Sequence, residues 1–280
     1  MEKKLKHLKS KANEVRKLIV EMLARAGSGH PGGSLSSADI ITCLYLEIMR
    51  HNPKEPKWPD RDKFHLSKGH CCPALYAVLA VCGYFSKEKL WTLRKLNSML
   101  QGHPDKRVPG IELASGSLGQ GLSIALGMAL GAKIDKKDSR IYCLMGDGEL
   151  QEGNIWEAAM AAAHYKADNL CGIVDCNHFQ IDGRTEDVMN IEPLVNKWEA
   201  FGWHVVSCDG HNLEGLLNAF SEAKTIKLKP TVIIAHTVKG KGVSFMEHVV
   251  DFHGRVPTEK EREIAIRELS EIEKTECETE

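Results

Sequence analysis

The middle of the chain alternates short, nearly continuous apolar runs with longer amphipathic segments, and this alternation limits the fold more than any other feature of the sequence. The apolar runs are rich in Val, Ile, Leu and Cys and cover residues 140–145, 170–175, 203–208 and 231–236. Segments with helical spacing lie between them, at residues 155–165, 193–201 and 213–226. Strands that are apolar on both faces and alternate with helices are typical of a parallel sheet covered on each side. We therefore predict a three-layer α/β/α fold with a mainly parallel sheet, in which ligands bind beyond the carboxyl ends of the strands.

Helical patterns also occur on both sides of this central region. Apolar residues recur at helical spacing over residues 5–26, and further helices are predicted at residues 36–49, 73–83, 87–100 and 118–133. Ser36 or Ser37 is the candidate N-cap of the second helix. Thr258 and Glu261 form a capping-box pattern at the start of another predicted helix. We expect one domain over residues 1–280, with a helical N-terminal segment at 1–50 and a helical C-terminal tail at 258–280.

The charge balance and the cysteines narrow the possible classes of protein. The 280 residues include 37 Lys and Arg against 38 Asp and Glu, a net charge of −1, which argues against a nucleic-acid binder or a polybasic membrane binder. The longest nearly apolar run, residues 121–132, is shorter than the about 20 residues of a membrane-spanning helix. Nine cysteines without a C-x-x-C pair are interpreted as reduced core thiols of a cytoplasmic protein rather than as zinc ligands. The N-terminus also lacks the continuous apolar core of a signal peptide.

Polar residues follow two of the predicted strands directly. Gly146, Asp147 and Gly148 come after the strand at 140–145, and Asn177 follows the next strand, 30 residues beyond Asp147. That interval suits one crossover between neighbouring parallel strands, which would bring Asp147 and Asn177 side by side. A carboxylate and an amide oxygen suit Mg²⁺, which completes its octahedron with phosphates and water. For Asp147 alone, a tight turn is the simpler interpretation, because Asp-Gly is common in turns.

The pair belongs to a longer, ordered set of segments that resembles the transketolase family over nearly the whole chain. The segments are residues 28–32 (SGHPG), 61–70 (RDKFHLSKGH), 102–104 (GHP), 115–121 (SGSLGQG), 146–153 (GDGELQEG) with Asn177, 180–183 (QIDG), 240–242 (GKG) and 253–254 (HG). The resemblance implies the three-layer thiamine-diphosphate-binding fold. Two departures stand out: Ser117 replaces a frequent proline, and Cys71-Cys72 replaces smaller residues.

The resemblance covers only the first of the three transketolase domains, the one that binds the diphosphate. It therefore implies the N-terminal subunit of a split transketolase, and a C-terminal partner subunit that carries the pyrimidine-binding domain. In the family, that second domain supplies a glutamate that contacts the aminopyrimidine and helps to activate the cofactor. An α2β2 assembly and sugar phosphate substrates follow by the same analogy, with no nucleic-acid or membrane partner.

The resemblance also implies a cofactor site. Asp147 and Asn177 would bind the metal through their side chains and Phe179 through its carbonyl, with Mg²⁺ expected and Ca²⁺ or Mn²⁺ as alternatives. Asn177 also counts as a cofactor contact. The further contacts to thiamine diphosphate are His70, Gly148 and His253 at the diphosphate, Gly116 and Leu118 at the rings, and Ile181 and Val238 at the bend of the cofactor.

The resemblance implies that histidines are the catalytic residues of this chain. His30, His103 and His253 match positions that face substrate hydroxyls and the carbonyl oxygen, a task that suits a group whose pKa lies near neutrality. Glu152 matches a glutamate at the subunit interface, although a first-turn carboxylate that complements the helix dipole is nearly as good an interpretation. Arg61 and Lys68 could contact phosphate, but we interpret them as solvated surface charges.

The sequence is compatible with three functions. The first is the transfer of a two-carbon ketol unit from a ketose phosphate to an aldose phosphate, in pentose phosphate metabolism. The second is a related ketol transferase similar to 1-deoxyxylulose-5-phosphate synthase, which the Gly-His-Pro segments disfavour. The third is a non-catalytic regulatory subunit, which the intact metal-ligand pattern of Asp147 and Asn177 disfavours.

Overall fold

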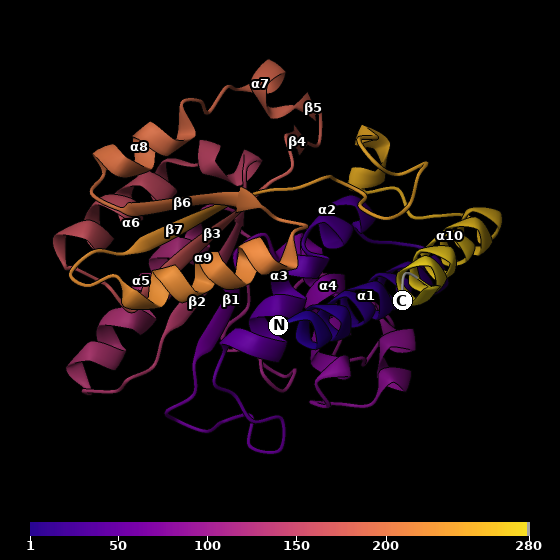
Figure 1. The fold of residues 1–280 in the computed structure, drawn as a ribbon, viewed down its shortest axis with the longest axis horizontal. Helices are drawn as coiled ribbons and strands as arrows, with labels where there is room; N and C mark the ends of the chain where they lie inside the picture. Colours follow the sequence, from indigo (N-terminus) through magenta and orange to yellow (C-terminus); the bar gives the residue numbers. More distant parts are fainter. Residues whose placement is uncertain (279–280) are drawn as a thin grey trace.

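The computed structural model describes residues 1–278, with a five-stranded sheet at its centre (Figure 1). The strand order is β1-β2-β3-β7-β6, and all neighbouring strands are parallel. The strands are β1 (Lys63–Leu66), β2 (Ile141–Gly146), β3 (Leu170–Cys176), β6 (His204–Asp209) and β7 (Thr231–His236). The predicted parallel sheet is thus confirmed. Strand β1 was missed, because its four residues lie inside the charged segment 61–70.

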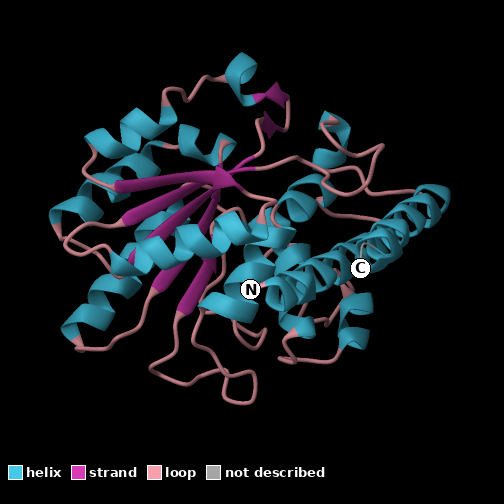
Figure 2. Cartoon of the chain, in the orientation of Figure 1, coloured by secondary structure: helices cyan, strands magenta, loops and turns pink. Residues whose placement is uncertain are grey.

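Helices cover both faces of the sheet, as Figure 2 shows. They are α1 (Glu2–Ala26), α2 (Pro31–Ser36), α3 (Ala38–Cys43), α4 (Cys72–Val81), α5 (Gln120–Ile134), α6 (Gly153–His164), α7 (Thr185–Val188), α8 (Leu194–Ala200), α9 (Leu213–Thr225) and α10 (Glu259–Glu278). A two-stranded hairpin of β4 (Phe179–Gln180) and β5 (Gly183–Arg184) follows β3. The last two residues of the predicted C-terminal tail, 279 and 280, lie outside the described residues.

Two hydrophobic clusters hold the three layers together. Tyr142 and Leu144 of β2 belong to the cluster that includes α1, α3, α4 and α9. Cys143 and Met145 belong to the cluster that includes α5, α6 and α8. Successive side chains of a strand point to opposite faces, so a strand buried on both faces has to be apolar at every position. This is the physical reason for the uninterrupted apolar runs in the sequence.

Two of the predicted helices differ from the structure. The helix expected at residues 36–49 is divided into α2, α3 and a π-helical turn at Leu44–Ile48, and α2 begins at Pro31, where proline suits a first helical position. Ser37 is the N-cap residue of α3, but neither Ser36 nor Ser37 caps a helix through its side chain, because their hydroxyls bond to Asp175 and to the Gly33 carbonyl.

The prediction of a helix at residues 87–100 was also wrong. Only a 3₁₀ segment at Lys87–Thr92 forms there. The chain then turns through Arg94 and Asn97, whose φ angles of 60° and 65° are left-handed. Such angles cannot continue a right-handed helix. The other short 3₁₀ segments are Gly69–Cys71, Gly148–Gln151 and Val250–His253.

The C-terminal helix α10 packs along α1 (Figure 1). The predicted capping box is confirmed: the Thr258 amide donates to Glu261 Oε2 at 2.8 Å, and the Glu261 amide donates to Thr258 Oγ1 at 3.3 Å. Leu269 is buried, and its carbonyl accepts a hydrogen bond from Asn13 of α1 at 2.7 Å. Helix α10 therefore covers one side of helix α1.

The cysteines whose side chains the structure describes are all unpaired thiols, as expected. Most of them are buried, and only Cys82 and Cys208 are half-buried. In the part of the chain that the structure describes, no helix combines the length and the apolar character needed to cross a bilayer.

The central position of β3 yields a stability prediction. Ile173 lies in the middle of β3 with no exposed surface, so Ile173→Ala should lower the free energy of unfolding by about 2–5 kcal/mol. Urea unfolding followed by circular dichroism measures the change. Ile134→Ala is the matched control, because Ile134 is 80% exposed and its truncation should change the free energy by less than about 0.5 kcal/mol. Equal effects of the two substitutions would contradict the central place of β3.

Candidate active site

A cavity of about 420 Å³ lies beyond the carboxyl ends of β1, β2, β3 and β7. Loops from both ends of the sequence reach it, because a parallel sheet brings the exits of all its strands to one edge. Eleven of the predicted site residues line it: His30, His70, Gly116, Leu118, Asp147, Gly148, Glu152, Asn177, Phe179, Ile181 and His253. Residues far apart in the sequence thus converge on one polar space of the size of a small-molecule site.

Asp147 and Asn177 meet at this edge as the strand spacing predicts. Each directly follows its strand, β2 or β3, and each is buried, with exposed fractions of 2% and 5%. Asp147 accepts hydrogen bonds from the amides of Gly148 at 2.9 Å and His178 at 2.5 Å, while Asn177 Oδ1 accepts one from the Phe179 amide at 3.1 Å. These contacts hold two oxygen donors in fixed orientations on the cavity wall.

The environment of Asp147 favours a cation. Burial, followed by the nearby charge of Asp175, raises the pKa of Asp147 to about 7. A positive ion beside a buried carboxylate favours its charged form and lowers its pKa. A divalent ion at Asp147 and Asn177 would therefore remove the electrostatic cost that the carboxylate carries in the protein alone.

Three of the predicted histidines form a cluster on the cavity wall. The ring centroids of His30, His70 and His253 lie 5.2–5.5 Å apart. Burial, with added effects from neighbouring positive groups, lowers the pKa of His30 to about 4, of His70 to about 2 and of His253 to about 3. The rings are therefore neutral at pH 7, and each can donate one hydrogen bond and accept another. His30 Nδ1 is buried without a partner in the protein, so it is available to a ligand.

The other predicted site residues divide into two groups. Gly148 lines the cavity, and so do the exposed side chains of Leu118, Glu152 and Ile181. His103 and Val238 do not line it.

His103 lies beside Gly116, and Val238 is not part of the cavity wall. A Cβ atom on Gly116 would come within 2.9 Å of the His103 ring, and the φ angle of Gly116 is 148°, so only glycine fits there. The Val238 amide donates to His211 Nε2 at 2.8 Å. The structure therefore brings His103 to the rim of the cavity and leaves Val238 outside its lining.

The interpretation of Lys68 and Arg61 as solvated surface charges was wrong. Lys68 is 1% exposed and pairs with Asp175, and Arg61 is 8% exposed and pairs with Glu112. Burial alone would lower the pKa of Lys68, but the Asp175 carboxylate beside it raises this pKa above its usual range. The sequence carried no clear signal of this burial, because the strand before Lys68 is short and itself contains Lys63 and His65.

Lys239 is a second buried cation that the sequence reading missed. Its ammonium group lies 2.9 Å from His253 Nδ1 and 3.5 Å from the Phe179 carbonyl, and it lines the cavity. Burial lowers the pKa of Lys239 to about 8. A charged lysine with no carboxylate bonded to it in the described protein is suited to bind an anionic ligand such as a phosphate.

Glu149 positions the turn that carries Asp147. Its carboxylate accepts hydrogen bonds from the Gly146 amide at 3.1 Å, the Gly119 amide at 3.0 Å and the Ser67 hydroxyl. Burial raises the pKa of Glu149. One acidic side chain thus joins the exits of β1 and β2 to the start of α5.

A parallel sheet with a polar cavity beyond its carboxyl edge defines an α/β ligand-binding domain. The family model described as transketolase, thiamine diphosphate binding domain, matches residues 8–270. The chain therefore belongs to the transketolase family and contains its thiamine diphosphate binding domain, with the α/β fold expected for it.

Two relatives match this chain over almost their whole length. One subunit of the apulose-4-phosphate transketolase of Phocaeicola vulgatus is 48% identical over 272 residues, which cover 97% of each chain. The 6-deoxy-6-sulfo-D-fructose transketolase subunit SqwG of a Clostridium species is 47% identical over 263 residues, covering 94% of this chain and 96% of the relative. This chain is therefore similar to these transketolase subunits over almost their whole length.

The solved structure of Campylobacter jejuni transketolase superposes with a TM-score of 0.84 at 34% identity. The match covers 96% of this chain but only 48% of that one. The chain spans about half the length of this transketolase.

The buried ion pair between Lys68 and Asp175 yields a second stability prediction. Asp175→Ala should lower the free energy of unfolding by about 3–5 kcal/mol, because it leaves the Lys68 charge buried without a partner. Adding Lys68→Met to this variant should recover part of the loss, since the unpaired charge is then removed. Urea unfolding of the single and double variants measures the coupling, with Asp187→Ala at an exposed position as the control. Strictly additive losses would show that the two charges do not interact.

Proposed function

We propose that this chain is the diphosphate-binding subunit of a two-chain transketolase. The enzyme would move a two-carbon ketol unit from a ketose phosphate to an aldose phosphate, with thiamine diphosphate and a divalent metal ion. The observation that carries the proposal is the placement of Asp147 and Asn177 at adjoining strand ends, in the same cavity as buried Lys239. Residues 1–280 act as a single domain in this proposal.

The donor groups of the cavity fit a magnesium-bound diphosphate. We assign Asp147 and Asn177, with the carbonyl of Phe179, to Mg²⁺, because hard oxygen donors suit this ion and phosphate oxygens complete its shell. Ca²⁺ or Mn²⁺ would accept the same donors. On the phosphate side, the contacts proposed from the family pattern are His70, His253 and the backbone of Gly148, and Lys239 adds a positive charge beside them.

The apolar part of the cavity wall suits the rings of the cofactor. We assign Gly116, Leu118 and Ile181 to this contact, because all three line the cavity and Leu118 and Ile181 are 37% and 67% exposed. A wedge role for Val238 has less support, since that residue does not line the cavity. Bound thiamine diphosphate supplies the carbanion chemistry, and the protein supplies position and polarity.

The neutral histidines are proposed to serve the sugar. His30 and His253 lie on the cavity wall and His103 lies at its rim, where they can hydrogen-bond to hydroxyls and move protons at the substrate oxygens. Neutral rings are needed for this task, because an imidazolium ion can only donate. Glu152 would act at the contact with the partner chain; its position at the N-terminus of α6 also supports the alternative that it only complements the helix dipole.

A second chain is part of the proposal. The two relatives described above are named as subunits, and the solved transketolase is about twice as long as this chain. We propose a C-terminal partner with the pyrimidine-binding domain, in an α2β2 assembly. The unpaired thiols of the protein are compatible with a cytoplasmic location.

The proposed reaction has several candidate donor sugars. The family resemblance favours the ketoses of pentose phosphate metabolism, whereas the names of the two relatives refer to apulose-4-phosphate and 6-deoxy-6-sulfo-D-fructose. All of these reactions move the same two-carbon unit in our proposal, so they require the same cavity residues. Selection among the donors would come from groups that contact the far end of the sugar.

The metal assignment can be tested by binding. Asp147→Ala should abolish Mg²⁺-dependent binding of thiamine diphosphate to the complex of both chains, because it removes one of two fixed oxygen donors. Isothermal titration measures the affinity, and Asp135→Asn, at an exposed position, should leave it unchanged. An unaltered affinity of Asp147→Ala would remove Asp147 from the metal site.

The division into two chains can be tested by activity. The purified chain should show no ketol transfer by itself, and activity should appear when the partner chain is added. The assay uses pentose phosphate donors, apulose-4-phosphate and 6-deoxy-6-sulfo-D-fructose in parallel, with ribose 5-phosphate and glyceraldehyde 3-phosphate as acceptors. Turnover by the chain alone would contradict the two-chain proposal, and turnover of none of the donors by the complex would contradict ketol transfer.

A further inference from the structure

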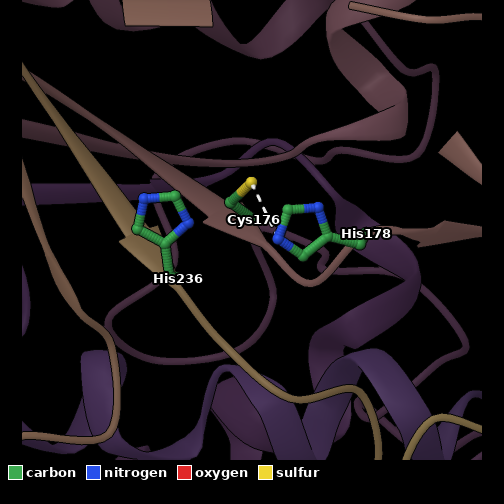
Figure 3. Close-up of side chains that lie close together, drawn as sticks. All are labelled: Cys176, His178 and His236. Atoms are coloured by element: carbon green, nitrogen blue, oxygen red, sulfur yellow. Dashed lines mark hydrogen bonds between the residues drawn. The ribbon is translucent and has the colours of Figure 1, made fainter. Parts of the chain in front are cut away.

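Three potential metal ligands converge beside the cavity at residues that the proposed reaction does not use. They are Cys176 at the end of β3, His178 just after it and His236 at the end of β7, and Figure 3 shows the two rings on either side of the thiol. One ligand atom from each side chain lies within 4.8 Å of the other two. Within the described part of the chain, this is the group of His, Cys, Asp and Glu side chains whose geometry could hold a metal ion.

The backbone explains why the three side chains meet. Cys176 and His236 are register partners in neighbouring parallel strands, so their side chains leave the sheet on the same face. His178 has a left-handed φ angle of 64°, which is uncommon for a residue other than glycine. This angle directs the chain into the β4–β5 hairpin and leaves His178 Nε2 at 3.9 Å from Cys176 Sγ.

One of the two histidine rings, that of His236, already has an orienting hydrogen bond of the kind that metal ligands usually have. The rings of His178 and His236 stack with an interplanar angle of 15° and centroids 6.2 Å apart. His236 Nε2 shares a hydrogen bond with Ser207 Oγ at 3.0 Å, and its other ring nitrogen faces Cys176 in Figure 3. Metal-binding histidines commonly hold one nitrogen in such a bond, which orients the ring and leaves the second nitrogen for the ion.

The local charges also favour a cation. Asp147, Asp175 and Glu192 are close enough to act electrostatically on the Cys176 thiol. The positive group near His178 is Arg184, which forms an ion pair with Glu186 at 2.6 Å. Because Asp175 is paired with Lys68, Asp147 and Glu192 are the acidic groups that favour a bound cation at the thiol.

We propose that Cys176, His178 and His236 form a binding site for a borderline-soft divalent metal ion of the Zn²⁺ class, with water as the fourth ligand. Zinc binds a thiolate at about 2.3 Å and imidazole nitrogens at about 2.0–2.1 Å. Small rotations of the half-buried His178 and the exposed His236 bring the donors to those distances. The thiol proton leaves to solvent when the metal–sulfur bond forms.

This site differs in chemistry from the one assigned to Asp147 and Asn177. Sulfur and imidazole donors select zinc and similar ions, whereas carboxylate and amide oxygens select Mg²⁺. The two sites are adjacent, because Cys176 and His178 are the chain neighbours of Asn177. A metal bound at the cysteine site would join the end of β7 to the segment that carries Asn177 and Phe179, and so restrict its motion. The proposal does not depend on the proposed function.

Cobalt spectroscopy on the full chain tests the proposal. Co²⁺ is titrated as the probe into the reduced protein, with excess Mg²⁺ present to fill oxygen-only sites. The expected result is one Co²⁺ per chain with a thiolate-to-cobalt charge-transfer band, which is lost when Zn²⁺ is added. Cys176→Ser should abolish this band, and His236→Ala should weaken binding at least about tenfold.

The matched controls are Cys208→Ser and His204→Ala, which change a half-buried thiol and a histidine on β6 outside the cluster. Both should bind Co²⁺ as the parent chain does. Because His236 is exposed, its variant should fold even if Cys176→Ser does not. The absence of a charge-transfer band in the parent chain would overturn the proposal, as would a band that remains at full strength in His236→Ala.

Discussion

The buried ion pair between Lys68 and Asp175 is the constraint on which the candidate active site depends. Asp175 also accepts hydrogen bonds from Ser36 at 2.6 Å and from Thr237, so one carboxylate joins α2, the exit of β1, the end of β3 and the exit of β7. Removing a charge from water costs several kcal/mol, and only complete pairing offsets that cost. Displacing any of these elements would leave the buried Asp175 carboxylate with fewer partners. The cost of that loss holds the edge of the sheet in one arrangement.

The same desolvation determines the protonation of the cavity wall. Burial keeps His30, His70 and His253 neutral, and it raises the pKa of Asp147 towards neutrality while lowering that of Lys239 to about 8. The wall of the cavity thus contains charged side chains, such as Asp147 and Lys239, that are incompletely paired in the protein alone. A magnesium-bound diphosphate would complete these pairs, so cofactor binding and stabilisation of the wall are expected to accompany one another.

The position of the cavity explains why a second chain is expected. Loops of this chain form the edge beyond the sheet, but the apolar side chains of Leu118 and Ile181 remain partly exposed at it. This chain matches only 48% of the solved transketolase, so about half of that protein has no counterpart here. A division into two chains would separate the residues proposed to hold the diphosphate from those proposed to contact the pyrimidine. The Cys176 cluster lies on the first of these parts, beside the segment that carries Asn177.

Local pattern was sufficient for four of the five strands of the sheet, all but β1, and for the meeting of Asp147 with Asn177. A strand buried on both faces must be apolar at each position, and parallel strands must end at one edge, so both features follow from residues that are near one another in sequence. Tertiary structure alone decided the burial of Lys68, the division of the helix expected at 36–49 and the place of Val238 outside the cavity. The convergence of Cys176 with His236 belongs with these, because it depends on the register of two strands that are 60 residues apart in the chain. Such contacts are set by packing between distant segments, and no periodicity in the sequence records them.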